Sequence, residues 1–393
     1  MDTSKIDICI VGGCGHVGLP LGLAFAKAGN RVALYDINAS VVALVNEAVM
    51  PFRENGADEL LKAVRASQML YASTDKKAVR NAKTIILVTG TPVDEHLNPR
   101  VNDVINVVNQ LIPELQDSQL IVLRSTLFPG TTRKVYQHLV SAGRACDVAF
   151  CPERIAEGHA IKELPALPQI VSGCTSSAAS RGAALFAQLA CNIVELNPEE
   201  AELAKLFTNA WRYINFAVSN QFFMIAEAHN IRFHRVYDAM TRGYPRLAGF
   251  ARPGFAAGPC LFKDTMQLSA FSGNNFFLGH SAMLVNEGLP NFIVGKMKEQ
   301  IGLSGKVAGI LGMAFKGESD DARASLSYKL RKLLQLECAR VVCSDEYIAD
   351  PTFVPMEEVI RQSEVIVIGA PHLRYRNLNL QGKAVFDVWN MIS

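Results

Sequence analysis

The chain has 393 residues, of which 49% are hydrophobic and 19% charged, with 39 basic residues against 37 acidic ones. This composition is typical of a compact globular protein of two or three domains and excludes an intrinsically disordered chain. Because the charges nearly balance and form no dense basic stripe, we expect no nucleic-acid partner.

Targeting and metal signals are absent from the sequence. The apolar run at the N-terminus is too short, and broken too early by glycine, for a signal peptide. No stretch approaches the roughly 18 uninterrupted apolar residues of a membrane helix. The nine cysteines are scattered without a C-x-x-C pair, a pattern typical of mainly structural, reduced thiols. We therefore expect a cytoplasmic protein with no membrane partner and no metal site.

The chain opens with a strand–turn–helix–strand signal. Residues 6–11 form a β-branched run long enough for a buried strand, and an Ala/Leu-rich helix follows until Gly29 and Asn30. Residues 31–35 form a second strand, which ends at Asp36. This order of elements is typical of a nucleotide-binding βαβ unit.

Between the first strand and the helix lies G-x-G-x-x-G, formed by Gly13, Gly15 and Gly18. The first glycine permits the tight turn, the second lets backbone amides approach a pyrophosphate, and the third allows close helix packing. The helix N-terminus offers N–H groups and a partial positive charge to the phosphates. Asp36 can accept both ribose hydroxyls and would repel a 2′-phosphate, so the sequence predicts NAD rather than NADP.

Three further strands end in polar turns, within 83–95, 119–132 and 144–158. Ligands of open α/β sheets lie outside the carboxyl ends of the strands. By position alone, the candidate site residues are therefore Thr91, Ser125, Thr126, Glu153 and Glu157. The alternative interpretation is a helix cap or turn for each hydroxyl and a solvated loop for each glutamate.

Residues 197–230 predict a long helix, which begins with Asn197 as a cap and Pro198 in the first position. Lys205, Asn209 and Arg212 share one face of this helix at i, i+4 and i+7. They form either a solvated stripe or a substrate-facing row that supplies charge and orients a water or an oxyanion. A helix of this length also suggests a spine between domains and a subunit interface.

The last section predicts a second nucleotide-binding-type α/β unit, with a strand over 306–311, a helix over 325–337 and further strands beyond. Its first turn carries Lys316 and Arg323 in place of the glycine motif, so a phosphate there would be held by side-chain cations. Asp320 and Asp321 would position Arg323. The alternative is a surface turn with internal ion pairs.

One cysteine has a distinctive setting, in the segment "GPCLFKDTM". Cys260 is expected in a turn, with Lys263 and Asp264 three and four positions later. A nearby cation favours the thiolate and holds charge on a covalent adduct. A hydride acceptor in the same cleft would turn covalent capture into oxidation.

Together these motifs resemble the UDP-glucose/GDP-mannose dehydrogenase family, from about Ile6 to Asn390. The segments that carry the resemblance occur in the family's order: "GGCGHVGLPLG", "VTGTPV", "STLFPGTT", "CPERIAEG", "AELAKLFTNAWRYINFAVSN", "YPR", "GPCLFKD" and "LGMAFKGESDDARAS". The resemblance implies a four-electron oxidation of a sugar C6 alcohol to a carboxylate, with reduction of two NAD⁺.

The resemblance also implies residue roles. Cys260 would capture the aldehyde as a thiohemiacetal that becomes a thioester. The other implied catalytic residues are Lys205, Asn209, Asp264, Glu157, Glu153 and Thr126. The implied cofactor contacts are Gly13, Cys14, Gly15, His16, Val17, Gly18, Asp36, Thr91, Ser125, Lys263 and Arg323. The implied substrate contacts are Arg212, Arg246, Phe315 and Lys316, with Arg246 reaching the neighbouring subunit's site.

The loop before Cys260 departs from the family pattern. The family has G-x-G-G-x-C, whereas this chain reads "PGFAAGPC", with Ala256, Ala257 and Pro259. "PER", Arg212 and "YPR" resemble the branch that acts on UDP-N-acetylhexosamines, whereas Glu157 and the "KD" after the cysteine resemble the UDP-glucose branch. The sugar therefore stays open between these two classes.

Two other functions are compatible with parts of the sequence. A single-step β-hydroxyacid-type dehydrogenase also combines a dinucleotide-binding domain with a helical K-x-x-x-N, as in Lys205 to Asn209. A non-catalytic NAD and nucleotide-sugar binding protein would explain the altered loop before Cys260. The first would produce one NADH per turnover and the second none.

The expected fold is α/β, with two Rossmann-like doubly wound domains joined by a long central helix and a small helical domain. We expect an NAD-binding domain over 1–196, a central helical and dimerisation domain with the catalytic cysteine over 197–298, and a UDP-binding domain over 299–393. The expected partners are a UDP-sugar substrate and further copies of the chain, in a homodimer or higher homo-oligomer.

Overall fold

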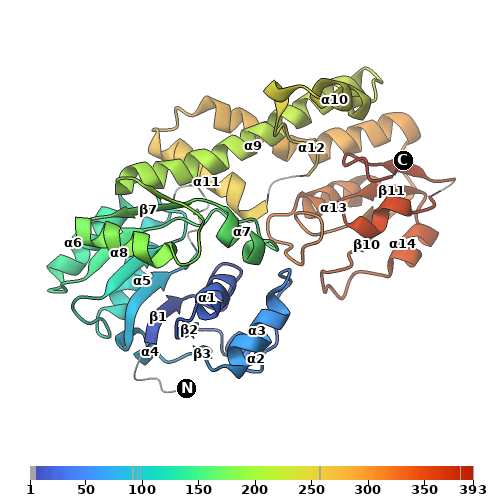
Figure 1. The fold of residues 1–393 in the computed structure, drawn as a ribbon. Helices are drawn as coiled ribbons and strands as arrows, with labels where there is room; N and C mark the ends of the chain where they lie inside the picture. The colour runs from blue at the N-terminus through green and yellow to red at the C-terminus, as the bar shows by residue number, and fades with distance from the viewer. Residues whose placement is uncertain are drawn as a thin grey trace. The chain divides into compact units, whose positions relative to one another are not determined.

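A computed structural model of the chain describes residues 6–90, 93–94, 96–97, 99–255, 258–380 and 382–392. The chain divides into two compact units, Met1–Phe207 and Thr208–Ser393. Each unit contains its own sheet with helices packed on it (Figure 1).

The sheet of the first unit has the strand order β3-β2-β1-β4-β5-β6-β7-β8. Among its described strands, only β6 and β7 pair antiparallel, and the other neighbours are parallel. Its strands are β1 (Ile6–Val11), β2 (Val32–Tyr35), β3 (Leu70–Ser73), β4 (Ala82–Leu87), β5 (Leu120–Leu123), β6 (Asp147–Phe150), β7 (Gln169–Gly173) and β8 (Ile193–Glu195). The order reverses between β1 and β4, the place at which doubly wound sheets bind their ligands.

The helices of the first unit connect these strands. They are α1 (Gly18–Lys27), α2 (Ala39–Asn46), α3 (Ala57–Ala66), α4 (Lys77–Arg80), α5 (Val101–Leu111), α6 (Thr131–Ser141), α7 (Ala160–Ala166) and α8 (Ser176–Phe186).

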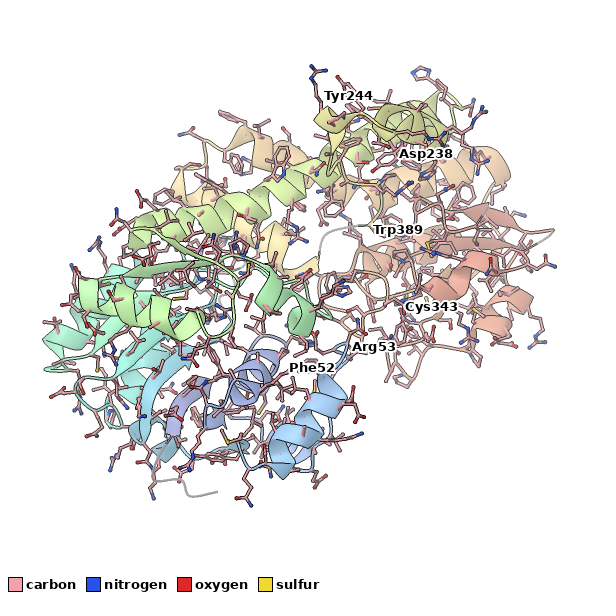
Figure 2. All side chains as sticks on the ribbon, in the orientation of Figure 1. Phe52, Arg53, Asp238, Tyr244, Cys343 and Trp389 are labelled. Atoms are coloured by element: carbon pink, nitrogen blue, oxygen red, sulfur yellow. The ribbon has the colours of Figure 1, made fainter. Side chains whose placement is uncertain are left out.

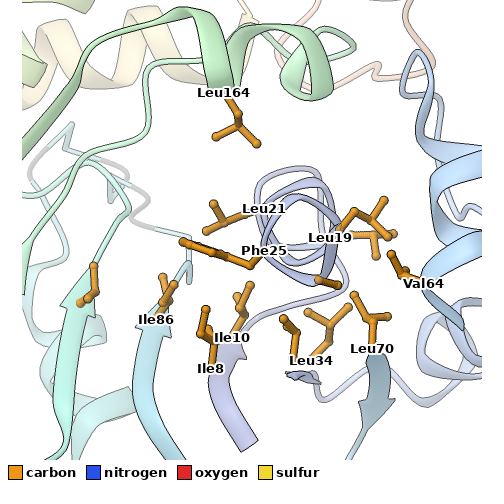
Figure 3. Close-up of a cluster of buried hydrophobic side chains, with 14 of the residues drawn as sticks. Ile8, Ile10, Leu19, Leu21, Phe25, Leu34, Val64, Leu70, Ile86 and Leu164 are labelled. Atoms are coloured by element: carbon orange, nitrogen blue, oxygen red, sulfur yellow. The ribbon is translucent and has the colours of Figure 1, made fainter. Parts of the chain in front are cut away.

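Side chains of β1 alternate between two hydrophobic clusters, one on each face of the sheet. Ile8 and Ile10 pack under α1 with Leu21 and Phe25, as Figure 3 shows. Cys9 belongs to the cluster on the opposite face, together with residues of α5 and α6. Because both faces are covered, β1 is apolar except for Asp7 near its start, which pairs with Lys83 at 2.9 Å.

A single helix, α9 (Pro198–Ala228), is 31 residues long and continues from the first unit into the second. It begins with Pro198, whose missing N–H is compatible with the first turn, and Glu199 and Glu200 follow there. This helix confirms the prediction over 197–230.

The second unit combines helices with a four-stranded parallel sheet of order β10-β9-β11-β12. Its strands are β9 (Val307–Leu311), β10 (Arg340–Ser344), β11 (Val365–Ile368) and β12 (Ala384–Phe386). Its other elements are α10 (Phe233–Thr241), η1 (Pro245–Leu247), α11 (Gly258–Phe271), α12 (Phe277–Ile301), α13 (Leu326–Glu337), α14 (Met356–Gln362) and η2 (Leu373–Asn377). No helix of the described residues is both long and apolar enough to span a bilayer.

Candidate active site

In the glycine-rich turn between β1 and α1, two of the three glycines leave no room for a side chain, and the third does. A Cβ on Gly13 would lie 2.6 Å from the Ile10 carbonyl oxygen, and one on Gly18 would lie 2.8 Å from the Gly12 carbonyl oxygen. Gly15 is exposed, and the nearest atom to its Cβ position is 3.9 Å away. Gly13 and Gly18 therefore permit close packing, while Gly15 leaves the N-terminus of α1 open to a phosphate.

Asp36, directly after β2, is held in a fixed orientation by backbone N–H groups. Its Oδ2 accepts from the backbone N of Cys14 at 3.0 Å, and its Oδ1 accepts from that of Asn38 at 3.1 Å. Burial, with a contribution from Asp36, raises the pKa of the Cys14 thiol to about 12, so this thiol stays protonated at neutral pH. Together with Val17 at the N-cap of α1, these residues fit the ribose and pyrophosphate of a dinucleotide.

His16 and Glu157 lie near one another although they are distant in sequence. The Nδ1 of His16 is 3.9 Å from Oε1 of Glu157, and both side chains are mostly buried. The imidazole also contacts the ring of Phe52, which Figure 2 labels, at a centroid distance of 4.1 Å. The structure thus brings a predicted cofactor residue and a predicted catalytic carboxylate together in the first unit.

The ends of β4 and β5 carry the predicted hydroxyl residues. Ser125 Oγ donates to the Thr89 carbonyl oxygen at 2.6 Å, which ties the two strand ends together. Thr126 follows and is half-buried. Thr91 lies outside the described residues.

Glu153 is engaged in a buried ion pair. The guanidinium of Arg124, which has no exposed surface, donates to its Oε2. Its Oε1 accepts from the backbone N of Arg154 at 2.7 Å and of Ile155 at 2.9 Å. Both oxygens therefore hold the loop after β6 in shape, and that loop presents Glu157.

The three polar residues on α9 differ in exposure. Lys205 is 9% exposed and Asn209 is 3% exposed, whereas Arg212 is exposed. A solvated stripe is therefore wrong for Lys205 and Asn209. Burial of an amine and an amide on a shared helix face is expected only where polar partners compensate for lost water.

Cys260 lies in the first turn of α11, so the prediction that it sits in a turn is wrong. The helix begins at Gly258, whose φ of +66° is a backbone conformation that glycine adopts readily. Pro259 follows, and proline is tolerated in a first helical turn because its missing N–H needs no partner there. The Cys260 side chain is exposed at this positive end of the helix.

Asp264 is the centre of a buried hydrogen-bonded cluster one turn further along α11. Its side chain has no exposed surface. Asn209 Nδ2 donates to Oδ2 at 2.6 Å, and Lys263 Nζ donates to Oδ1 at 2.6 Å. In the second unit the structure therefore joins three of the predicted residues, with Cys260 on the same helix.

Most other cysteines are unsuited to nucleophilic attack. Burial raises the pKa of Cys9 and Cys151 to about 12, and that of Cys174 and Cys343 to about 11. Among the nine, only Cys191 and Cys260 are exposed. Cys191 lies between α8 and β8, where its Sγ donates to the Ala166 carbonyl oxygen.

The turn after β9 packs against the start of α11 inside the second unit. A Cβ on Gly258 would lie 2.6 Å from the Phe315 ring, so that ring lies directly on the backbone two residues before Cys260. Lys316 Nζ lies 5.4 Å from the centre of the same ring. Arg323, further along the turn, pairs with Asp321 through Nε at 2.9 Å and NH2 at 2.5 Å, a pairing that both interpretations of this turn predict.

Arg246, a predicted substrate contact, is an exposed residue of the second unit. It belongs to η1, is exposed, and its guanidinium stacks on the ring of Tyr244 at 5.6 Å. Figure 2 labels Tyr244.

Asp345 follows β10 as Asp36 follows β2, but its environment differs. Its Oδ2 accepts from the backbone N of Met313 at 2.5 Å and of Ala314 at 2.9 Å, and lies 3.1 Å from His372 Nε2. Both side chains of the Asp345–His372 pair have no exposed surface. A cavity of about 420 Å³ opens beside Asp345 and Arg374, and none of the predicted site residues lines it.

Sequence reasoning missed the residues that hold the site residues in place: Arg124, Glu202, Asp345 and His372. Each is charged or titratable, and its side chain is fully buried. The available signal was a lone polar residue inside a predicted strand end or an apolar helix segment, such as Arg124 after "LIVL" and Glu202 in "AEL". Such a residue needs buried partners.

These features define an NAD-dependent oxidoreductase with a second nucleotide-binding-type sheet. Three segments match the UDP-glucose/GDP-mannose dehydrogenase family: its NAD binding domain over 6–190, its central domain over 199–287 and its UDP binding domain over 309–393. The chain belongs to the UDP-glucose/GDP-mannose dehydrogenase family. The predicted family, fold class and NAD cofactor are thereby confirmed.

Relatives match along nearly the whole chain. A UDP-N-acetyl-D-mannosamine dehydrogenase of Pyrococcus horikoshii is 28% identical over 97% of this chain and 94% of its own length. The solved structure of a UDP-D-ManNAc dehydrogenase from Pyrococcus horikoshii superposes with a TM-score of 0.92 over 99% of this chain and 96% of that one, at 26% identity. A UDP-glucose dehydrogenase of Pyrobaculum islandicum superposes with a TM-score of 0.90 at 25% identity, over 99% and 96%.

Proposed function

We propose that the protein oxidises the C6 alcohol of a UDP-hexose to the carboxylate, with Cys260 as the covalent nucleophile. The observation that carries the proposal is the exposed Cys260 at the N-terminus of α11, with the buried Asn209–Asp264–Lys263 cluster one turn along that helix. A thiol at the positive end of a helix is suited to attack a carbonyl carbon.

The reaction needs a hydride acceptor and a covalent anchor. When bound, NAD⁺ accepts a hydride, and two equivalents account for the four electrons between an alcohol and a carboxylate. Addition of the Cys260 thiolate to the C6 aldehyde gives a thiohemiacetal oxyanion, and loss of a hydride from that carbon leaves a thioester. Water then attacks the thioester, which releases the carboxylate and the Cys260 thiol.

The polar residues would stabilise these species. Lys205 would supply positive charge to the oxyanion, and Asn209 would orient it or the attacking water. Asp264 holds the Asn209 amide through its hydrogen bond and would keep it aimed. Glu157, on its ordered loop, is the proposed proton acceptor for the alcohol and for water, and Thr126 is proposed to lie near the cofactor and that water. Glu153 would act mainly by shaping that loop.

For the nucleotide, we propose that Phe315 and Lys316 contact the UDP moiety and that Arg212 and Arg246 contact the substrate. The proposed contacts of NAD are Gly13–Gly18, Asp36, Ser125, Lys263 and Arg323. The packing of Phe315 on Gly258 supports the first of these roles, because it places the turn of the UDP-binding-type sheet beside the helix that carries the thiol.

For the sugar, we propose a UDP-N-acetylhexosamine in preference to UDP-glucose. The motifs "PER" and "YPR" favour this class, and the relative from Pyrococcus horikoshii that matches 97% of the chain is a UDP-N-acetyl-D-mannosamine dehydrogenase. UDP-glucose is the alternative, since a UDP-glucose dehydrogenase has nearly the same fold.

We also propose a homodimer, formed along α9. Five large apolar side chains on this helix are 38–65% exposed: Phe207, Trp211, Val218, Phe222 and Ile225. Their spacing of four, seven, four and three residues keeps them on one face, which is the pattern of a helix–helix seam. A second copy presents the same stripe, so the two faces are complementary under a two-fold axis.

The test is a panel of UDP-sugars with NAD⁺, followed at 340 nm, with the uronate quantified. We expect two NADH per uronate formed. Cys260→Ser should abolish completion of the four-electron reaction, while the matched control Cys191→Ser, which changes the other exposed thiol, should keep wild-type turnover. Full activity of the Cys260 variant would refute the nucleophile, and one NADH per turnover would favour a single-step dehydrogenase.

A further inference from the structure

Helix α6 begins without a side-chain cap of its own. Its N-cap residue is Gly130, whose φ is +89°, and glycine has no side chain to accept the first N–H groups of the helix. Those N–H groups need an acceptor where they are buried, because water cannot reach them.

The missing acceptor comes from another helix, at Glu202 on α9. Its Oε2 accepts from the backbone N of Gly130 at 2.6 Å, and its Oε1 accepts from both the backbone N and Oγ1 of Thr132, at 2.8 and 2.6 Å. Glu202 and Thr132 have no exposed surface. Burial raises the pKa of the Glu202 carboxyl, and the three hydrogen bonds oppose that effect by favouring the ionised form.

The hydrogen bonds fix a loop that carries predicted site residues. Residues 124–130 lead from β5 to α6 and contain Ser125 and Thr126. Leu127 of this loop and Ala201 of α9 are both buried in the same hydrophobic cluster. The loop is thus held to α9 by a carboxylate cap and by apolar packing.

Lys205 lies three residues after Glu202, so it follows one helical turn later on α9. We propose that Glu202 is a positioning residue, which locks the loop of Ser125 and Thr126 to the helix that carries Lys205. This role rests on the proposed function for its catalytic consequence, but the anchoring itself does not depend on the substrate.

The chain offers a matched control on the same pair of helices. Glu199, one turn before Glu202, pairs with Arg133 of α6, and both side chains are more than 40% exposed. Exposed ion pairs contribute little. Glu199→Gln and Glu202→Gln therefore make the same chemical change, at the surface and at the buried cap respectively.

Glu202→Gln leaves one acceptor oxygen for three donors, and its amide nitrogen then faces an N–H group. Amide hydrogen exchange over residues 125–132 should accelerate by at least about tenfold relative to wild type, with Glu199→Gln within twofold. In the UDP-sugar assay, kcat of Glu202→Gln should fall by about tenfold or more, with KM for the UDP-sugar changed far less.

A second variant covers the case in which Glu202→Gln does not fold. Thr132→Val removes one donor with little change in shape and should give smaller effects of the same sign. Exchange over 125–132 that stays at the wild-type rate in the folded variants would overturn the proposal, as would unchanged kcat despite faster exchange. If the wild type oxidises no UDP-sugar, the proposed function fails, while the exchange comparison still decides whether Glu202 anchors the loop.

Discussion

Asn209 Nδ2 donates a 2.6 Å hydrogen bond to Asp264 Oδ2, across 55 residues of sequence and between two different helices. Lys263 occupies the other carboxylate oxygen, so Asp264 fixes both an amide and an ammonium group. The buried carboxylate therefore orients Asn209, which is proposed to hold the oxyanion or the water, and Lys263, which is proposed to contact NAD, and replacing it releases both groups.

We expect Asp264→Asn to lower kcat by roughly 100-fold, the effect of losing one preorganised electrostatic contact in an active site. The reason is that an Asn amide must offer an N–H to Asn209 or to Lys263, both of which already donate. Steady-state kinetics with the best UDP-sugar measures it, and circular dichroism checks that the variant is folded. A folded variant with wild-type kcat would contradict the proposed role.

Replacement of Asp36 tests the coenzyme preference. Two unit charges about 4 Å apart repel by about 1 kcal/mol in water and more near a protein surface, so Asp36→Asn should improve the ratio of NADP to NAD use by roughly tenfold. It should also raise KM for NAD, because the hydroxyls lose a charged acceptor. Initial rates with both coenzymes give the ratio. An unchanged ratio would show that Asp36 does not face the ribose.

Gly258→Ala tests the close packing of Phe315 on α11. Alanine at φ +66° is strained, and its Cβ would lie 2.6 Å from the ring, so we expect a loss of about 1–3 kcal/mol in unfolding free energy. Activity should fall as well, because Cys260 is two residues away. The control is Gly288→Ala in α12, where no atom other than the adjoining backbone of that helix lies within 4 Å of the Cβ position and alanine favours the helix. Urea denaturation that ranks the two variants equally would contradict this packing.

The Asp345 network predicts a pH-dependent contribution to stability. Burial alone would raise the pKa of Asp345, but hydrogen bonds from His372 and from backbone N–H groups outweigh burial and lower it below 3.8. A lowered folded-state pKa stabilises the fold above the ordinary pKa, and this contribution disappears as the pH falls through the folded-state value. Asp345→Asn should therefore be less stable than wild type by about 1–3 kcal/mol at pH 7.

The difference in unfolding free energy between Asp345→Asn and wild type should shrink as the pH approaches 3. Denaturant unfolding at pH 7, 5 and 3 gives the series. His372 is the side-chain partner in this network: its Nδ1 accepts from the backbone N of Glu318 at 2.9 Å, so the hydrogen on Nε2 faces Asp345. A stability difference that grew as the pH fell would contradict this prediction.

The sequence by itself determined the elements that local pattern encodes. The strand at 6–11, the glycine turn, Asp36 at the end of the next strand and the helix over 197–230 were all predicted, because β-branched runs, glycine spacing and capping residues act over a few positions. The strands after residue 306 followed from the same periodicity. The sequence also singled out Cys260 among nine cysteines, through its charged neighbours.

The tertiary structure decided which of these residues are buried and what they bind. Cys260 lies in a helix and not in a turn. Both carboxylate oxygens of Glu153 accept hydrogen bonds. On α9, Lys205 is buried whereas Arg212 is exposed. Strand β6 pairs with β7 antiparallel, and Glu202 caps a helix 70 residues away. Such pairings join residues distant in sequence, and their free energy depends on desolvation and geometry that no local pattern contains.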